Sequence, residues 1–158
     1  MKQRTIITLL ILILTCPGLY AQKIYKGNSS YASDIICNIV QEKIYKGQFT
    51  YSSDMIAQFD GTSLFRGSSS YRSDIILTYR NGKIYEGTSP YESDVLATWR
   101  DSKMYSKSSS YRSDVLFTYK GNKVYRKNEP YYSSVLFTTS AHVHPIILYL
   151  IFINSEDE

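Results

Sequence analysis

Residues 75–86 read IILTYRNGKIYE, and this stretch decides the fold. Two runs rich in β-branched and aromatic residues flank Asn81-Gly82, a pair that tolerates the positive φ angles of a two-residue type I′ turn. Such a turn fixes the register of an antiparallel hairpin. The resulting register pairs Tyr79 with Ile84, Thr78 with Tyr85, Leu77 with Glu86 and Arg80 with Lys83.

This register also sorts the side chains, because neighbours along a strand point to opposite faces. The predicted core face carries Ile75, Leu77, Tyr79 and Ile84. The other face is mixed and carries Ile76, Thr78 and Tyr85, with Arg80 and Lys83 near the turn.

The pattern recurs in six units of twenty residues that fill 23–142 without an insertion. The units are KIYKGNSSYASDIICNIVQE (23–42), KIYKGQFTYSSDMIAQFDGT (43–62), SLFRGSSSYRSDIILTYRNG (63–82), KIYEGTSPYESDVLATWRDS (83–102), KMYSKSSSYRSDVLFTYKGN (103–122) and KVYRKNEPYYSSVLFTTSAH (123–142). Below, "places" count from the first residue of each unit. The ninth place is always Tyr, the eleventh is always Ser, and the twelfth is Asp in the first five units.

A single hairpin is not stable in water, so the units must stack or close on one another. We therefore expect an all-β fold of tandem antiparallel β-hairpin repeats, arranged as an elongated solenoid-like sheet or a closed one. The alternative is a parallel β-helix with one unit per coil. That arrangement would stack five Asp carboxylates about 4.8 Å apart, where they repel unless a cation binds, so hairpins are favoured.

Composition limits the protein class. The chain has 158 residues, 43% hydrophobic, with 16 Tyr, two Cys and a formal charge of +4. The apolar and aromatic content excludes a disordered chain, and the cysteine count excludes a disulfide-stapled miniprotein. Nucleic acid is not an expected partner, because basic and acidic residues alternate and no recognised nucleic-acid-binding motif is present.

Residues 1–21 have the order of a secretory signal peptide: a basic start, an apolar middle and Ala21 at the expected cut. We therefore expect a secreted or periplasmic protein with a repeat domain at 22–142 and a C-terminal cap with an acidic tail at 143–158. The alternative is a lipoprotein anchored at the cell envelope through Cys16, the one route by which a membrane would be a partner.

The motif K-I-Y-x-G-x-S-x-Y-x-S-D-I-[IL] resembles a short tandem repeat found in secreted proteins of Gram-negative bacteria. The resemblance covers nearly the whole chain after residue 21. It carries no catalytic residues across, so it implies no activity.

The residues that could carry chemistry have simpler structural interpretations. Within the repeats His142, at the last place of the sixth unit, is the one histidine, so the repeated Ser-Asp pairs lack a recurring base and we expect no enzyme activity and no cofactor. The Asp series is expected to hydrogen-bond nearby backbone rather than to bind calcium, and His142 and His144 are expected to be surface or cap residues rather than metal ligands. Cys37 is expected to be a small buried hydrophobe.

The apolar run at 145–153 is too short to span a membrane as a helix. We expect a closing strand or a helical cap on the last repeat. The alternative is an aggregation-prone or membrane-touching tail.

The predicted function is that of a non-enzymatic binding or adhesion module for a glycan or a cell-surface protein. The candidate contact surface is a semi-exposed row on the mixed face, in which aromatic rings stack on a ligand and hydroxyls bond to it. Its residues are Tyr25, Tyr45, Tyr85, Tyr105 and Tyr125, with Thr78, Thr98 and Thr118; Phe65 takes the third place in the remaining unit. The ninth-place tyrosines are instead expected to lie on the neighbouring unit. The alternative function is a structural protein that forms homo-oligomers through exposed edge strands.

Overall fold

The computed structural model describes residues 21–156, in which the six units form strands, short 3₁₀ turns and one terminal helix. The strands are β1 (Gln22–Lys26), β2 (Ile35–Val40), β3 (Lys43–Lys46), β4 (Met55–Phe59), β5 (Ser63–Arg66), β6 (Ile75–Arg80), β7 (Lys83–Glu86), β8 (Val95–Arg100), β9 (Lys103–Ser106), β10 (Val115–Lys120), β11 (Lys123–Arg126) and β12 (Val135–Thr139). The 3₁₀ turns are η1 (Ala32–Asp34), η2 (Ser52–Asp54), η3 (Arg72–Asp74), η4 (Glu92–Asp94), η5 (Arg112–Asp114) and η6 (Tyr132–Ser134). The helix is α2 (Pro145–Glu156).

The hairpin predicted from residues 75–86 is confirmed, with all four expected pairs between β6 and β7. Its turn residues Asn81 and Gly82 have φ angles of 50° and 78°, as a type I′ turn requires. Gly82 is also needed for close approach, because a Cβ at this position would lie 3.0 Å from the Trp99 carbonyl oxygen. The turn thereby packs directly against the next hairpin.

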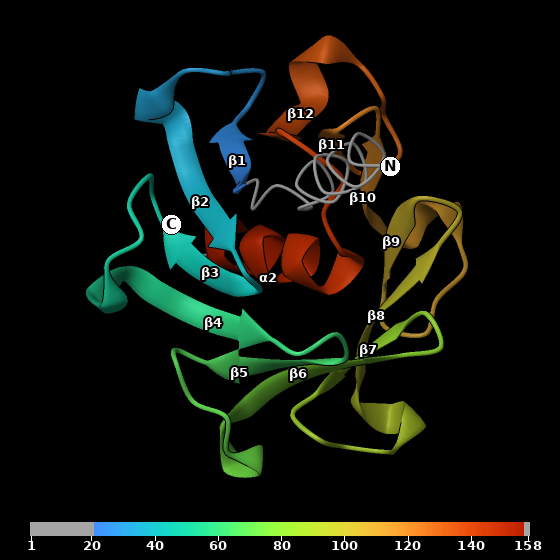
Figure 1. The fold of residues 1–158 in the computed structure, drawn as a ribbon. Coiled ribbons are helices and arrows are strands. Elements are labelled where there is room, and N and C mark those ends of the chain that lie inside the picture. Colours follow the sequence, from blue (N-terminus) through green and yellow to red (C-terminus); the bar gives the residue numbers. More distant parts are fainter. Residues whose placement is uncertain (1–20, 157–158) are drawn as a thin grey trace, which may run out of the picture.

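The twelve strands form a closed antiparallel barrel, in which each strand pairs with its sequence neighbours and β1 returns to β12. The closing pairs are Ile24–Thr139, Tyr25–Thr138 and Lys26–Phe137. Figure 1 shows the resulting ring, with the loops inside each unit extending outward. Of the two arrangements expected for the hairpins, the sheet is thus the closed one, and the parallel β-helix alternative is wrong.

The centre of the ring is filled by α2 (Figure 1). Eight strands already give a barrel interior that side chains can fill, so twelve leave a space that needs a further element. Residues 145–152 of the helix are all buried, which explains why its sequence is apolar all round. Of the closing strand and the helical cap expected for this segment, the structure has a helix. It lies inside the barrel instead of covering the last repeat (Figure 1). Within residues 21–156, no helix has the length and apolar character needed to cross a membrane.

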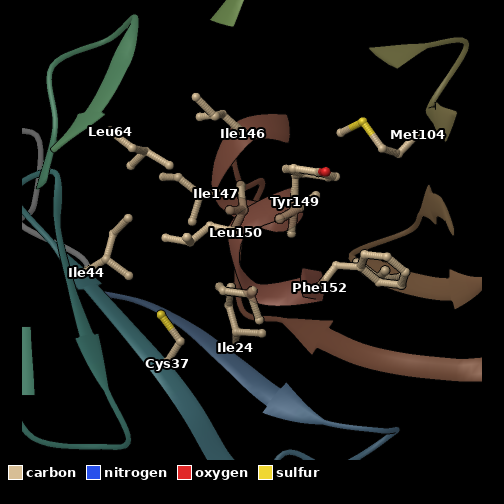
Figure 2. Packing of buried hydrophobic residues seen from close by; sticks show 14 of the residues in the cluster. Ile24, Cys37, Ile44, Leu64, Met104, Ile146, Ile147, Tyr149, Leu150 and Phe152 are labelled. Atoms are coloured by element: carbon tan, nitrogen blue, oxygen red, sulfur yellow. The ribbon is translucent and has the colours of Figure 1, made fainter. Parts of the chain in front are cut away.

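Three places of the repeat supply the strand side of the core. The second-place residues are all completely buried: Ile24, Ile44, Leu64, Ile84, Met104 and Val124. Fifteenth- and seventeenth-place residues join them, and Figure 2 shows members of this cluster around Ile147, Leu150 and Phe152 of α2. Cys37 is buried among them as predicted, and this burial raises the pKa of its thiol to about 12.

A β-bulge changes which residues face this core. In the pairing of β7 with β8, Ile84 lies opposite Ala97 and Tyr85 lies opposite Val95, so Leu96 is the extra residue. The same shift occurs in all six pairings that enclose the outer loops. Fourteenth-place residues such as Ile76 therefore pack against the core, and Ile75 pairs instead with the third-place Phe65 on the outer face. The predicted faces of Ile75 and Ile76 are thus exchanged, because simple alternation does not anticipate a bulge.

Candidate functional site

The predicted tyrosine row lies on the outer face of the barrel, but three of its five members are covered. Tyr45, Tyr85 and Tyr105 are only 8%, 9% and 7% exposed, whereas Tyr25 and Tyr125 are half-buried. The row is therefore less exposed than the hairpin register alone suggests.

Tyr85 shows how a ring of this row is covered. It lies between Thr78 on β6 and Val95 on β8, which are its cross-strand partners. The Arg80 guanidinium lies 4.4 Å from the ring centroid and also donates a hydrogen bond to the Ser89 carbonyl oxygen in the outer loop. Arg100 covers Tyr105 in the same way, at 5.1 Å. The ring faces available for ligand stacking are thus used within the protein.

The predicted threonines fasten the outer loops to the barrel. Thr78 Oγ1 donates to the Gly87 carbonyl oxygen at 2.6 Å, Thr98 Oγ1 to that of Lys107 at 2.8 Å, and Thr118 Oγ1 to that of Lys127 at 2.9 Å. Because these hydroxyl protons already have acceptors, the contacts assign the threonines a structural role.

The repeated Asp and Ser organise the outer loops of the first, third, fourth and fifth units, and the loop of the fourth unit shows how. Ser89 Oγ donates to a carboxylate oxygen of Asp94 and accepts a hydrogen bond from the Tyr91 backbone N–H at 3.2 Å. Ser93 Oγ donates to the other oxygen of Asp94 at 2.9 Å. Both hydrogen bonds lower the pKa of Asp94, and the bond from Ser89 has the larger effect. The aspartate is structural, but its partners are hydroxyls rather than the expected backbone donors.

In the first, third, fourth and fifth units this network holds the ninth-place tyrosine, which directly precedes the 3₁₀ turn in all six units. These residues are Tyr31, Tyr51, Tyr71, Tyr91, Tyr111 and Tyr131, which we call the tyrosine rim. They are between 62% and 74% exposed, and the outer loops that carry them lie at the periphery of the ring in Figure 1. Within the described part of the chain, none of their hydroxyls makes a hydrogen bond, and Tyr51 alone makes a ring contact, with Phe49 at 5.4 Å. The expectation that these rings lie on the neighbouring unit is therefore wrong.

The two histidines lie where the chain enters the barrel. His144 is half-buried between the rings of Phe59 and Tyr79, both 4.8 Å away, and its Nδ1 accepts a hydrogen bond from the Ile146 N–H at the start of α2. Burial lowers the pKa of His144, and the neighbouring His142 lowers it further by a smaller amount. His142 is exposed. Surface and capping roles thus account for both residues.

The structure assembles neither a metal centre nor a catalytic triad among residues 21–156. No group of three or more candidate metal ligands is found there. The serine–aspartate pairs lie in the outer loops, and neither histidine is hydrogen-bonded to them in this part of the chain. The hydroxyls of Ser89 and its equivalents are used to hold the loop.

Sequence reasoning missed the tyrosine rim although its signal was present. Tyr is found at the ninth place of all six units, in a loop of small and hydroxyl residues that offers little apolar surface to cover it. A large residue repeated without a packing partner indicates a contact surface.

Comparison with known proteins agrees with this architecture. A family model described as "6-fold beta flower protein" matches residues 24–150, which include most of the six units and half of α2. Neither the curated proteins nor the solved structures contain a significant match to the chain.

Proposed function

The chain belongs to the 6-fold beta flower family, and on this scaffold we propose that it acts as a non-enzymatic binding module that contacts a glycan or protein surface through the tyrosine rim. The contact surface is thus moved from the third-place row of the repeat to the ninth-place residues. The proposed location is outside the cytoplasm, based on residues 1–21; residues 1–20, including the alternative lipid-anchor residue Cys16, lie outside the described part of the chain.

The observation that carries this proposal is that the rim residue is Tyr in every unit while remaining at least 62% exposed. Tyr offers a large amphipathic contact area and has few side-chain torsions to immobilise on binding, which is why it is enriched in binding surfaces. The serine–aspartate network holds the loop beneath four of the six rings. An exposed aromatic ring on a fixed loop is suited to recognition and adds little to packing.

The arrangement favours a repetitive partner. The tenth-place residue beside each rim tyrosine differs between units: Ala32, Ser52, Arg72, Glu92, Arg112 and Tyr132. The element shared by the six contacts is therefore the aromatic ring itself. Six weak contacts on one rigid barrel give high avidity for a surface that repeats the same chemistry, such as an insoluble polysaccharide.

The proposal is tested by replacing one, three and then all six rim tyrosines with Ser and measuring co-sedimentation with cellulose, chitin, peptidoglycan and insoluble calcium alginate, of which the last consists of carboxylate-bearing sugars. For a polysaccharide that retains the wild-type protein, we expect retention to fall with each step by more than the fraction of tyrosines removed, because avidity is multiplicative. Tyr85→Phe is the matched control, since it changes a tyrosine of the covered row. Unchanged retention of the six-fold variant would refute the proposal, as would failure of the wild type to bind any of the polysaccharides or a panel of surface proteins.

Self-association through edge strands loses its structural basis. All twelve described strands have a neighbour on both sides, so no edge remains for another copy to extend. Formation of fibres by the wild type, observed by electron microscopy, would restore this alternative.

A further inference from the structure

The candidate for a further site is a hollow of about 610 Å³ beside the β10–β11 hairpin. We call it the β10–β11 pocket. Its principal lining residues are Trp99, Lys103, Lys120, Asn122, Asn128 and His142. The volume lies within the range of pockets that hold small organic molecules.

The pocket lies beside the eighteenth place of the repeat, which is Arg in two units, Lys in this one, and Val40, Asp60 or Ser140 in the others. At the eighteenth place, Arg80 and Arg100 lie over the third-place tyrosines of their hairpins and donate hydrogen bonds to the carbonyl oxygens of Ser89 and Ser110 in the outer loops. The equivalent residue in the β10–β11 hairpin is Lys120. Among residues 21–156, the side chain of Lys120 makes no hydrogen bond, ion pair or ring contact, and the residue is exposed.

The place that a guanidinium fills in the β6–β7 and β8–β9 hairpins is consequently vacant here. Tyr125, which Lys120 would cover, is half-buried, whereas the arginine-covered tyrosines are less than a tenth exposed. Asn128 and Pro130 of the outer loop line the hollow, in the part of the loop where the arginines are bonded in the other hairpins. The pocket therefore adjoins this vacancy, which results from the shorter reach and different head group of lysine; Tyr125 itself is not among the residues that line the pocket.

The charged residues that line the β10–β11 pocket favour an anion. Lys103 and Lys120 both line it, together with His142. The acidic lining residue is Asp101, and its carboxylate is paired with Arg100 at 3.7 Å, so it offsets the lysines only in part. A carboxylate entering the pocket would form charge-assisted hydrogen bonds with these amines.

The other lining groups are suited to a sugar. The side chains of Asn122 and Asn128 can donate to and accept from hydroxyls, and the half-buried Trp99 ring offers an apolar surface for C–H groups. From these observations we propose that the β10–β11 pocket binds one carboxylate-bearing sugar unit. The proposal rests on the proposed function, since it names an acidic sugar as the component of a polysaccharide partner that would be recognised individually.

Trp99 provides a direct probe because it is the single tryptophan of the chain. Titration with sodium glucuronate should give a saturable change in its fluorescence. Glucose and acetate, matched in concentration and ionic strength, should give little change, because glucose lacks the carboxylate and acetate lacks the sugar ring and its hydroxyls. An equal response to acetate would identify a simple anion site and overturn the proposal, and an absent response to glucuronate would also overturn it.

Two variants test the charge and the vacancy separately. Lys120→Gln should weaken glucuronate binding roughly tenfold, the effect expected for losing a hydrogen bond to a charged group. Lys120→Arg keeps the charge but should also weaken binding, because the guanidinium can fill the space as Arg80 does in its hairpin. Lys26→Gln, an exposed charge change on β1 outside the lining, is the control and should bind as wild type. Unchanged binding by both Lys120 variants would overturn the proposal.

The six-fold rim variant separates this proposal from the previous one. It should retain the glucuronate titration while losing retention on polysaccharide. A glucuronate response in a protein that binds neither a polysaccharide nor a surface protein would support the pocket and refute the proposed function. Polysaccharide binding without a glucuronate response would support the proposed function and refute the pocket proposal.

Discussion

The third-place row and the tyrosine rim use the same residue at two places of one repeat, yet their surroundings are opposite. Tyr85 lies beneath a guanidinium and between two neighbouring strands, while Tyr91, six residues later, is 68% exposed. The difference comes from the outer loop, which is fastened to the barrel by Thr78 and Arg80 and carries the rim ring away from it. Residue type alone therefore does not identify the contact surface; the path of the loop decides it.

The largest expected effect is on stability when the two tyrosines are truncated. Tyr85→Ala should lower the free energy of unfolding by about 3 kcal/mol, as truncation of a buried aromatic ring does. Tyr91→Ala should change it by less than about 0.5 kcal/mol, because the ring is exposed. Urea unfolding of both variants measures the contrast, and equal losses would break the comparison.

A smaller effect is expected at the fastening of the loop. Thr78→Val should cost about 1–3 kcal/mol, because the carbonyl oxygen of Gly87 loses a donor in a part-buried position. Thr78→Ser retains the hydroxyl and serves as the control. Amide hydrogen exchange should show faster opening of residues 87–94 in the Val variant, and unchanged exchange there would mean that Thr78 does not hold the loop.

Removing the cover of the row should have a still smaller effect. Arg80→Lys takes away a planar cation above Tyr85 and should cost about 0.5–1 kcal/mol. Thermal unfolding checks the stability, and the exposure of the Tyr85 ring should rise toward that of Tyr125. If Tyr85 stays as protected as before, the neighbouring strands alone cover it, as they cover Tyr45, whose hairpin has Val40 at the eighteenth place.

The smallest effect concerns the serine–aspartate network beneath the rim. Its hydrogen bonds lower the folded-state pKa of Asp94 and Asp114 below the ordinary value of 3.8. The resulting stabilisation is present above pH 3.8 and is lost as the pH falls through the lower, folded-state values. In an NMR titration, Ser89→Ala should raise the pKa of Asp94 toward 3.8 and leave that of Asp114 unchanged. A shift of both would show that the loops are not independent.

Much of the fold could be predicted from residues 75–86 because a two-residue turn leaves one register for the flanking strands. The bulge could not, since Ile75 and Ile76 are chemically alike and alternation gives no reason to insert an extra residue. The position of α2 could not be predicted from the sequence either. The run 145–153 is apolar on every side, so it indicates that the segment is buried but does not indicate which part of the protein buries it. The rim was missed for a related reason, because an aromatic residue is expected to be buried unless the path of the chain shows otherwise.

The most direct test of the tyrosine rim as contact surface is residue-resolved nitration by tetranitromethane, read by mass spectrometry for the free protein and for the protein bound to polysaccharide. The rim tyrosines should be nitrated readily in the free protein and protected in the bound one, while Tyr45, Tyr85 and Tyr105 should react slowly in both. Rapid nitration of those three, or rim tyrosines that remain equally reactive after binding, would contradict the account.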